Sequence, residues 1–182
     1  RYELQLGPAT LYGSAPMTYQ GRVITCSTRG AAGVWEDTSG PILVAGLQQL
    51  GVNVNEPVVV ADGEPVLAAL RDAIADDVDV VLTTGGTGHT PRDLTPEMTR
   101  QVIDRESPGL AEAIRSFGVA HGVPTAVLSR GIAGLAEGTL IINAPGSPGG
   151  ARDTIAALAP VLLHALDQIA GGDHVRSEGA PT

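Results

Sequence analysis

One stretch near the middle of the chain, residues 80–97, constrains the fold more than any other part of the sequence. It opens with Val-Val-Leu-Thr-Thr at 80–84, an unbroken and mostly β-branched run typical of parallel strands that are buried on both faces. Three glycines follow within the next four positions, so the backbone there can approach a ligand closely. Thr95 and Pro96 then predict a helix start, with the threonine as N-cap and the proline at the first helical position.

Strand-like and helix-like segments alternate on both sides of this stretch. Asn55, Glu56 and Pro57 place the first half of one strand, at 52–60, at a sheet edge or a bulge. The alternation predicts an α/β fold, a three-layer αβα sandwich with a mainly parallel central sheet. Strands are expected at 22–27, 52–60, 80–84, 125–128 and 139–142, and helices at about 39–50, 64–75, 97–103, 110–119 and 151–170.

The length of 182 residues favours one domain with a full core, which we expect at residues 17–172. Residues 1–16 have no clear period and contain several glycines and prolines, so they are expected to form a flexible extension, with Met17 close to a natural start. The polar residues 173–182 are expected to form a mobile tail.

Charge and cysteine content exclude several classes of protein. A formal net charge of −9 argues against sequence-independent binding to nucleic acid. The single cysteine, Cys26, excludes an internal disulfide framework and a thiolate zinc site, and it favours an intracellular, cytoplasmic location. No apolar run approaches the roughly 18 residues of a membrane span, so no membrane association is expected.

Four loops with unusual chemistry each follow a predicted strand. The first contains Gly30, Gly33 and Asp37, and the second contains Asp62. The third is the glycine loop at 85–93, and the fourth covers 143–150. Because the carboxyl ends of parallel strands lie along one edge of a sheet, and ligands bind in the crevice there, we expect these loops to converge.

Glycine-rich backbone at a helix entrance suits an anion such as phosphate. Two carboxylates, Asp62 and Asp93, would repel that phosphate unless a divalent cation lay between them, and oxygen ligands with water are what Mg²⁺ prefers. The pattern therefore predicts magnesium-assisted phosphoryl or nucleotidyl transfer. Two familiar phosphate motifs are absent, because the loop lacks the Lys-Ser/Thr pair of a P-loop and has Pro91 where a dinucleotide fingerprint needs its third glycine.

Each candidate also has a purely structural interpretation. The glycines are compatible with a tight turn, Asp62 with a cap on the following helix, and Asp93 with a role in orienting its own loop. Asp37 is compatible with a solvated loop position and Ser129 with a simple turn.

The sequence positions of the histidines and of the cysteine do not indicate a catalytic role. His89 lies in the glycine loop without a partner at metal-ligand spacing, and Cys26 in a strand is typical of a small buried residue. Four arginines are phosphate-binding candidates that the sequence does not rank: Arg29, Arg92, Arg130 and Arg152.

The glycine stretch and three further blocks, in the same order, resemble the molybdenum-cofactor biosynthesis domain family. The resemblance covers about residues 22–170 and is specific because it involves several blocks. The blocks are Thr83-Thr84-Gly85-Gly86-Thr87-Gly88 with Pro91-Arg92-Asp93 and Thr95-Pro96-Glu97; Ser27-Thr28-Arg29 with Gly33 and Asp37; Leu128-Ser129-Arg130; and 142–148, Ile-Asn-Ala-Pro-Gly-Ser-Pro.

Within that family the chain is similar to the stand-alone molybdopterin adenylyltransferases. The resemblance implies that the terminal phosphate of molybdopterin attacks the α-phosphorus of ATP, with Asp62 and Asp93 as the essential acidic residues that act with Mg²⁺. It also implies a homotrimer and a molybdate-inserting enzyme as downstream partner. The implied nucleotide- and pterin-binding residues are Gly85, Gly86, Thr87, Gly88, Arg92, Ser27, Asp37, Ser129, Asn143, Pro145, Gly146 and Ser147.

Two positions depart from the family pattern. Ala144 replaces a larger apolar residue, and Thr28 stands where many members have aspartate. Two alternatives to the enzyme stay open: a molybdopterin carrier that does not catalyse transfer, and a dinucleotide-dependent oxidoreductase, against which the missing fingerprint counts.

Overall fold

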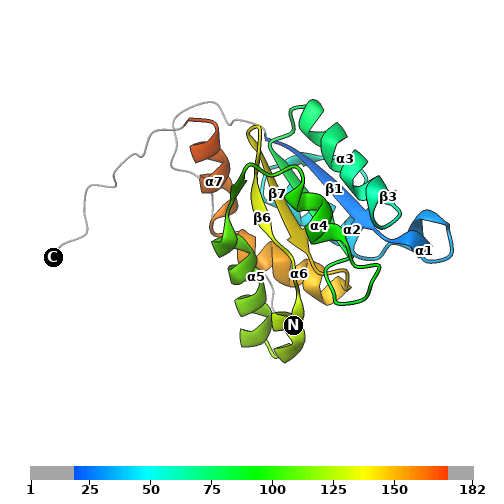
Figure 1. Cartoon of the computed structure of the whole chain (residues 1–182). Coiled ribbons are helices and arrows are strands. Elements are labelled where there is room, and N and C mark those ends of the chain that lie inside the picture. The colour runs from blue at the N-terminus through cyan, green and yellow to red at the C-terminus, as the bar shows by residue number, and fades with distance from the viewer. Residues whose placement is uncertain (1–18, 172–182) are drawn as a thin grey trace.

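A seven-stranded sheet forms the centre of the domain (Figure 1). The structure is a computed structural model that describes residues 19–171, so the expected extension at 1–16 and tail at 173–182 lie outside the described residues. The sheet order is β2-β1-β4-β7-β6-β5, and β3 also pairs with β1. The strands are β1 (Gln20–Cys26), β2 (Asn53–Val54), β3 (Val58–Val60), β4 (Val80–Thr84), β5 (Arg105–Glu106), β6 (Ala133–Ala136) and β7 (Thr139–Ala144).

The predicted buried strand, β4, lies in the middle of the sheet between β1 and β7 and runs parallel to both. All five of its residues are buried. Helices cover both faces, and the alternation of side chains divides the core: Val80 and Leu82 face one helix layer, whereas Val81 faces the other. The predicted three-layer α/β fold is confirmed.

One helix layer consists of α2, α5, α6 and α7, and the other of α3 and α4 (Figure 1). Leu43, Leu47 and Leu158 are fully buried on the first side, and Val66 and Leu70 on the second. In the part of the chain that is described, no helix has the length and apolar character needed to cross a membrane. The helices are α1 (Thr28–Ala31), α2 (Gly40–Gln49), α3 (Glu64–Ala75), α4 (Thr95–Arg100), α5 (Pro108–Ala120), α6 (Pro148–Leu158) and α7 (Leu162–Ile169), and a 3₁₀ helix, η1, covers Pro124–Leu128.

Prolines account for several differences from the expected elements. The expected strand at 125–128 is wrong, because this segment is the 3₁₀ helix η1, which starts at Pro124 and buries none of its residues. Residues 52–60 form two short strands, with Pro57 in the break, as the expected edge or bulge suggested. The single helix expected at 151–170 is two helices, because Pro160 cannot continue the hydrogen bonding of α6.

Three smaller elements were missed. α1 forms a single turn in the loop after β1, and β5 and β6 add an antiparallel edge to the parallel sheet. The predicted start of α4 is shifted by one residue: Leu94 holds the cap position, and Thr95 begins the helix with Pro96 second. Thr95 is therefore not the N-cap, and its hydroxyl oxygen is buried without a hydrogen-bond partner among the described residues.

Candidate active site

The loops that follow β1, β3, β4 and β7 converge at one edge of the sheet, as expected for the ends of parallel strands. The amide of Gly85 donates to the carbonyl of Ala144 at 3.3 Å, and the Thr84 hydroxyl donates to the carbonyl of Pro145 at 2.9 Å. A β-carbon added to Gly85 would lie 2.4 Å from the Cys26 carbonyl oxygen. Only glycine permits this close packing of three loops, particularly since the φ of Gly85 is +96°.

Asp62, at the end of β3, is held by Thr28 from the loop after β1. Its Oδ2 accepts hydrogen bonds from the Thr28 amide at 3.0 Å and the Thr28 hydroxyl at 2.6 Å. A β-carbon on Gly86 would lie 3.3 Å from Asp62 Oδ1, so this carboxylate lies beside the glycine loop. The alternative role as a helix cap is wrong, because Gly63 holds the cap position of α3 and no side chain caps it.

Asp93 lies on the other part of the glycine loop. Its Oδ2 accepts from the Thr90 amide at 2.8 Å, and a β-carbon on Gly88 would lie 2.9 Å from the same oxygen. Asp93 therefore does orient its own loop, while its carboxylate stays half-buried beside Gly88. Asp62 and Asp93 thus flank the segment from Gly86 to Gly88.

The donor set at this edge fits Mg²⁺. Within residues 19–171 no group of three or more His, Cys, Asp or Glu side chains is arranged to hold a metal. Asp62 and Asp93 together supply two carboxylates along the glycine loop. Such a pair suits a cation that keeps several waters and takes its remaining ligands from substrate phosphates, as Mg²⁺ does.

Asp37 and Asn143 use their side chains mainly within the protein. Asp37 accepts from the Thr25 hydroxyl at 2.6 Å and from the amides of Ser39 and Gly40 at the start of α2, so it is not merely solvated. The amide nitrogen of Asn143, a buried residue, donates to the hydroxyls of Thr83 and Thr99, and its oxygen accepts from the Ile132 amide. Their ligand-binding roles stay predictions.

Three serines at the same edge have turn or capping contacts. Ser27 caps α1 through the Gly30 amide, and Ser147 caps α6 through the Gly150 amide at 3.0 Å. Ser129 accepts from the Gly131 amide at 3.3 Å, which is the simple turn considered above.

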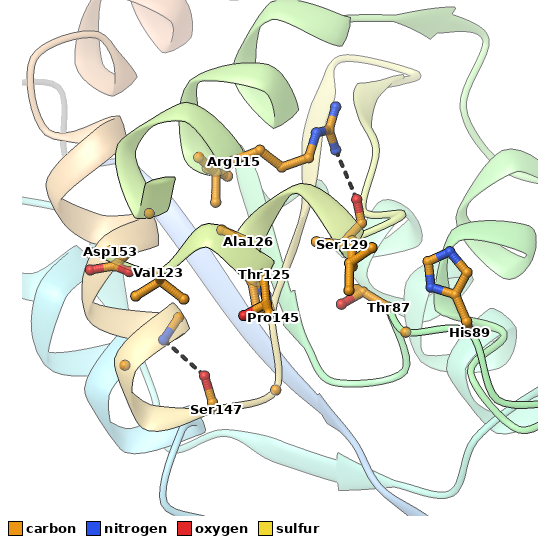
Figure 2. Close-up of a pocket in the computed structure, with 17 residues that line it drawn as sticks. Thr87, His89, Arg115, Val123, Thr125, Ala126, Ser129, Pro145, Ser147 and Asp153 are labelled. Atoms are coloured by element: carbon orange, nitrogen blue, oxygen red, sulfur yellow. Dashed lines mark hydrogen bonds between the residues drawn. The ribbon is translucent and has the colours of Figure 1, made fainter. Parts of the chain in front are cut away.

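A cavity of about 570 Å³ adjoins the glycine loop (Figure 2). Six predicted residues line it: Thr87, Gly88, Ser129, Pro145, Gly146 and Ser147. The opposite wall comes from α5, η1 and α6, and in Figure 2 the labelled His89 and Asp153 lie at opposite sides of it. Because Asp62 and Asp93 are not lining residues, the site has two parts, a carboxylate edge and a cavity, which share Thr87 and Gly88.

The residues of the opposite wall of the cavity were not predicted from the sequence. Arg115 lines the cavity and donates to the carbonyls of Ser129 and Gly131, at 3.3 and 2.9 Å. Thr125 and Leu128 also line it, from the segment that was expected to be a strand. His89, which lacked a recognisable partner in the sequence, is an exposed lining residue.

Two of the four candidate arginines have protein partners. The guanidinium of Arg29 stacks on the Trp35 ring, 3.6 Å from its centre. Arg130 forms an ion pair with Glu97, and the hydrogen bond from Arg130 lowers the pKa of Glu97 below its usual value. Arg92 is exposed beside Asp93, and Arg152 is exposed on α6.

Cys26 is a small buried residue, as expected, and burial raises the pKa of its thiol to about 12. A thiol that is protonated at neutral pH is a poor nucleophile.

Residues 22–164 match a protein family described as "Probable molybdopterin binding domain". The chain belongs to this molybdopterin-binding domain family. The resemblance seen in the sequence is thereby confirmed, and membership leaves no support for the dinucleotide-dependent oxidoreductase.

Named relatives agree with this assignment. A molybdopterin adenylyltransferase of Helicobacter pylori strain J99 is 37% identical over 153 residues, which are 82% of this chain and 86% of the relative. The molybdopterin adenylyltransferase of Escherichia coli K12 is 34% identical over 137 residues, 73% of this chain and 70% of the relative. The solved structure of the molybdopterin biosynthesis Mog protein from Mycobacterium ulcerans has a TM-score of 0.79 and 52% identity, covering 85% of this chain and 98% of that one.

Proposed function

We propose that the protein is a molybdopterin adenylyltransferase, which transfers AMP from ATP to the terminal phosphate of molybdopterin and releases pyrophosphate. The observation that carries the proposal is the pair of carboxylates, Asp62 and Asp93, on either side of a glycine loop that borders a cavity. Relatives with the printed name molybdopterin adenylyltransferase support the choice of substrates.

In this reaction an oxygen of the molybdopterin phosphate forms a bond to the α-phosphorus of ATP, and the bond from that phosphorus to pyrophosphate breaks. Asp62 and Asp93 would hold Mg²⁺, which when bound neutralises charge on the phosphates. The main-chain N–H groups of the glycine loop are suited to bind phosphate oxygens, because the glycines admit close approach. The fixed positions of both carboxylates reduce the reorganisation that phosphate binding would otherwise require.

The cavity is suited to hold one organic substrate beside the reacting phosphates. Its volume of about 570 Å³ lies in the usual range for small-molecule sites. Apolar side chains such as Ile114, Val123 and Leu128 contribute to its lining, and polar groups from Thr87 and Ser129 can orient a bound ring system. Because Thr87 and Gly88 belong to both parts of the site, a substrate in the cavity would place its phosphate near the carboxylate edge.

The proposal includes a homotrimer in the cytoplasm that passes its product to a molybdate-inserting enzyme. Two exposed apolar side chains outside the cavity lining support self-association: Val119 at the end of α5 and Val127 on η1. Light scattering on the purified chain tests this part, because a trimer has three times the molar mass of the chain.

Transfer is tested by mixing the protein with molybdopterin and Mg-ATP and by following pyrophosphate and adenylylated molybdopterin. We expect both products from the wild type and almost none from Asp93→Ala. A carrier would bind molybdopterin and yet give no product with either protein, and that result would refute the catalytic proposal.

A further inference from the structure

Arg130, which follows η1, contacts the glycine loop with both its main chain and its side chain. Its amide donates to the Thr87 carbonyl at 2.9 Å. Its Nε donates to the Gly88 carbonyl at 2.6 Å, and its Nη2 donates to the Asp93 carbonyl. One residue from a distant part of the chain thus binds three carbonyl oxygens within the loop.

Glu97, in the first turn of α4, fixes the guanidinium from the opposite side. Its Oε1 accepts from Arg130 Nη1, and its Oε2 accepts from Nη2 at 3.4 Å. The planar fork of a guanidinium can bind a carboxylate and two separate carbonyls at once, which a lysine ammonium group cannot match in geometry. Glu97 and the loop carbonyls therefore use most of the donors of Arg130.

The loop needs this support because its own hydrogen bonds are few. Between Thr87 and Asp93, the Asp93 amide donates to the Thr90 carbonyl at 3.0 Å, and the Thr90 amide donates to Asp93 Oδ2. These bonds close a turn but do not attach the turn to the rest of the protein. The contacts from Arg130 attach it on both sides, at Gly88 and at Asp93.

We propose that Arg130 is a positioning residue for adenylyl transfer: paired with Glu97, it fixes the glycine loop so that the Asp93 carboxylate and the Thr87–Gly88 backbone meet the substrate phosphates. This inference rests on the function proposed above. Arg130 thereby differs from the other candidate arginines in having no direct phosphate-binding role, because a guanidinium already paired with a carboxylate and two carbonyls is poorly placed to bind phosphate.

The test compares the variants Arg130→Lys, Arg130→Ala and Glu97→Gln with wild type. Arg22→Lys is the matched control, since Arg22 pairs with Asp76 away from this loop. We expect Glu97→Gln and Arg130→Lys to lower kcat about tenfold, and Arg130→Ala about 100-fold, with a higher Mg²⁺ concentration at half-maximal rate. Millimolar guanidinium should restore part of the activity of Arg130→Ala but none of that of Asp93→Ala.

A phosphate-binding role for Arg130 gives a different pattern. Glu97→Gln would then leave kcat and the Mg²⁺ requirement unchanged, and Arg130→Ala would raise only the KM for ATP. That pattern would overturn the proposal.

Amide hydrogen exchange of residues 85–95 supplies a readout that does not depend on turnover. Exchange should be faster in Glu97→Gln and Arg130→Lys than in wild type or Arg22→Lys, because the loop loses its attachment. If wild type releases no pyrophosphate, the proposed function fails, whereas unchanged exchange in both folded variants would refute the positioning role by itself.

Discussion

Asp62 and Asp93 lie on either side of the same glycine loop, but they are held in different ways. Asp62 is bound by the amide and hydroxyl of Thr28, which precedes it by 34 residues and belongs to the loop of a neighbouring strand. Asp93 is bound by the Thr90 amide, three residues earlier in its own loop. The position of Asp62 therefore depends on the pairing of β1 with β3. That of Asp93 depends on the conformation of one loop, which Arg130 attaches to the rest of the protein.

The two carboxylates should therefore respond to different substitutions. Changes in the loop should displace Asp93 and leave Asp62 in place, and changes at Thr28 should do the reverse. Both carboxylates nevertheless have to act on one Mg²⁺ in the proposed reaction. Loss of either should thus have the same chemical consequence.

The largest effect is expected when either carboxylate is neutralised. Asp62→Asn and Asp93→Asn should each lower kcat/KM about 100-fold or more, and the double variant should be little worse than the worse single variant, because groups that act as a unit are not additive. Steady-state pyrophosphate release measures this. The free energy of unfolding should change by less than about 1 kcal/mol, as is usual for loop positions outside the core. Losses that multiply in the double variant would show that the carboxylates act independently.

Substitutions at two glycines of the loop should have different effects, one on the stability of the protein and the other on the position of the Asp93 carboxylate. Gly85→Ala should cost about 3 kcal/mol of unfolding free energy, because its φ is +96° and the added carbon meets the Cys26 carbonyl oxygen at 2.4 Å. At Gly88 the added carbon meets only the movable end of the Asp93 side chain, so Gly88→Ala should cost about 1 kcal/mol or less while lowering turnover about tenfold. Denaturant unfolding and pyrophosphate release distinguish these outcomes. Equal losses of stability in the two variants would contradict the described packing.

The smallest effect concerns the partners of the two carboxylates. Thr28→Val removes the hydroxyl bond to Asp62 but keeps the bond from the Thr28 amide, so it should lower turnover about fivefold, the equivalent of one hydrogen bond of about 1 kcal/mol. Thr90→Val is the matched control, because Asp93 is bound by the main chain of Thr90 and not by its hydroxyl. Its turnover should stay within about twofold of wild type. A larger loss in Thr90→Val than in Thr28→Val would reverse the comparison.

The central strands β4 and β7 could be predicted from sequence because all their residues are buried. β4 contains the run Val-Val-Leu and β7 the run Leu-Ile-Ile, and chain order places a loop directly after each strand. The antiparallel edge of the sheet, formed by β5 and β6, could not be predicted from the sequence. β5 is an exposed Arg-Glu pair, and β6 is Ala-Gly-Leu-Ala, in which a β-carbon on Gly134 would lie 2.6 Å from the Arg105 carbonyl oxygen. The small residues of β6 are needed because a distant segment packs closely against it, and they show no alternation of apolar and polar residues that would predict a strand.

The candidate site likewise has one part that could be predicted from the sequence and one part that could not. Residues in the loops that follow strands, such as Asp62 and Asp93, could be proposed because the topology brings these loops together. The wall formed by Arg115 and η1 depends on how α5 packs. The composition of 125–128 favours a strand, whereas the segment is a 3₁₀ helix that starts at Pro124. The contact of Arg130 with Gly88 joins residues 42 positions apart and has no local signature in the sequence.

Direct metal binding tests whether Asp62 and Asp93 share one cation. Mn²⁺ can replace Mg²⁺ in an electron paramagnetic resonance titration of the protein with a non-hydrolysable ATP analogue. We expect one ion per chain, bound about tenfold or more weakly in both Asp62→Asn and Asp93→Asn, because each removes a ligand of the same ion. Two ions per chain, or an affinity unchanged by either substitution, would show that the two carboxylates do not bind the same ion.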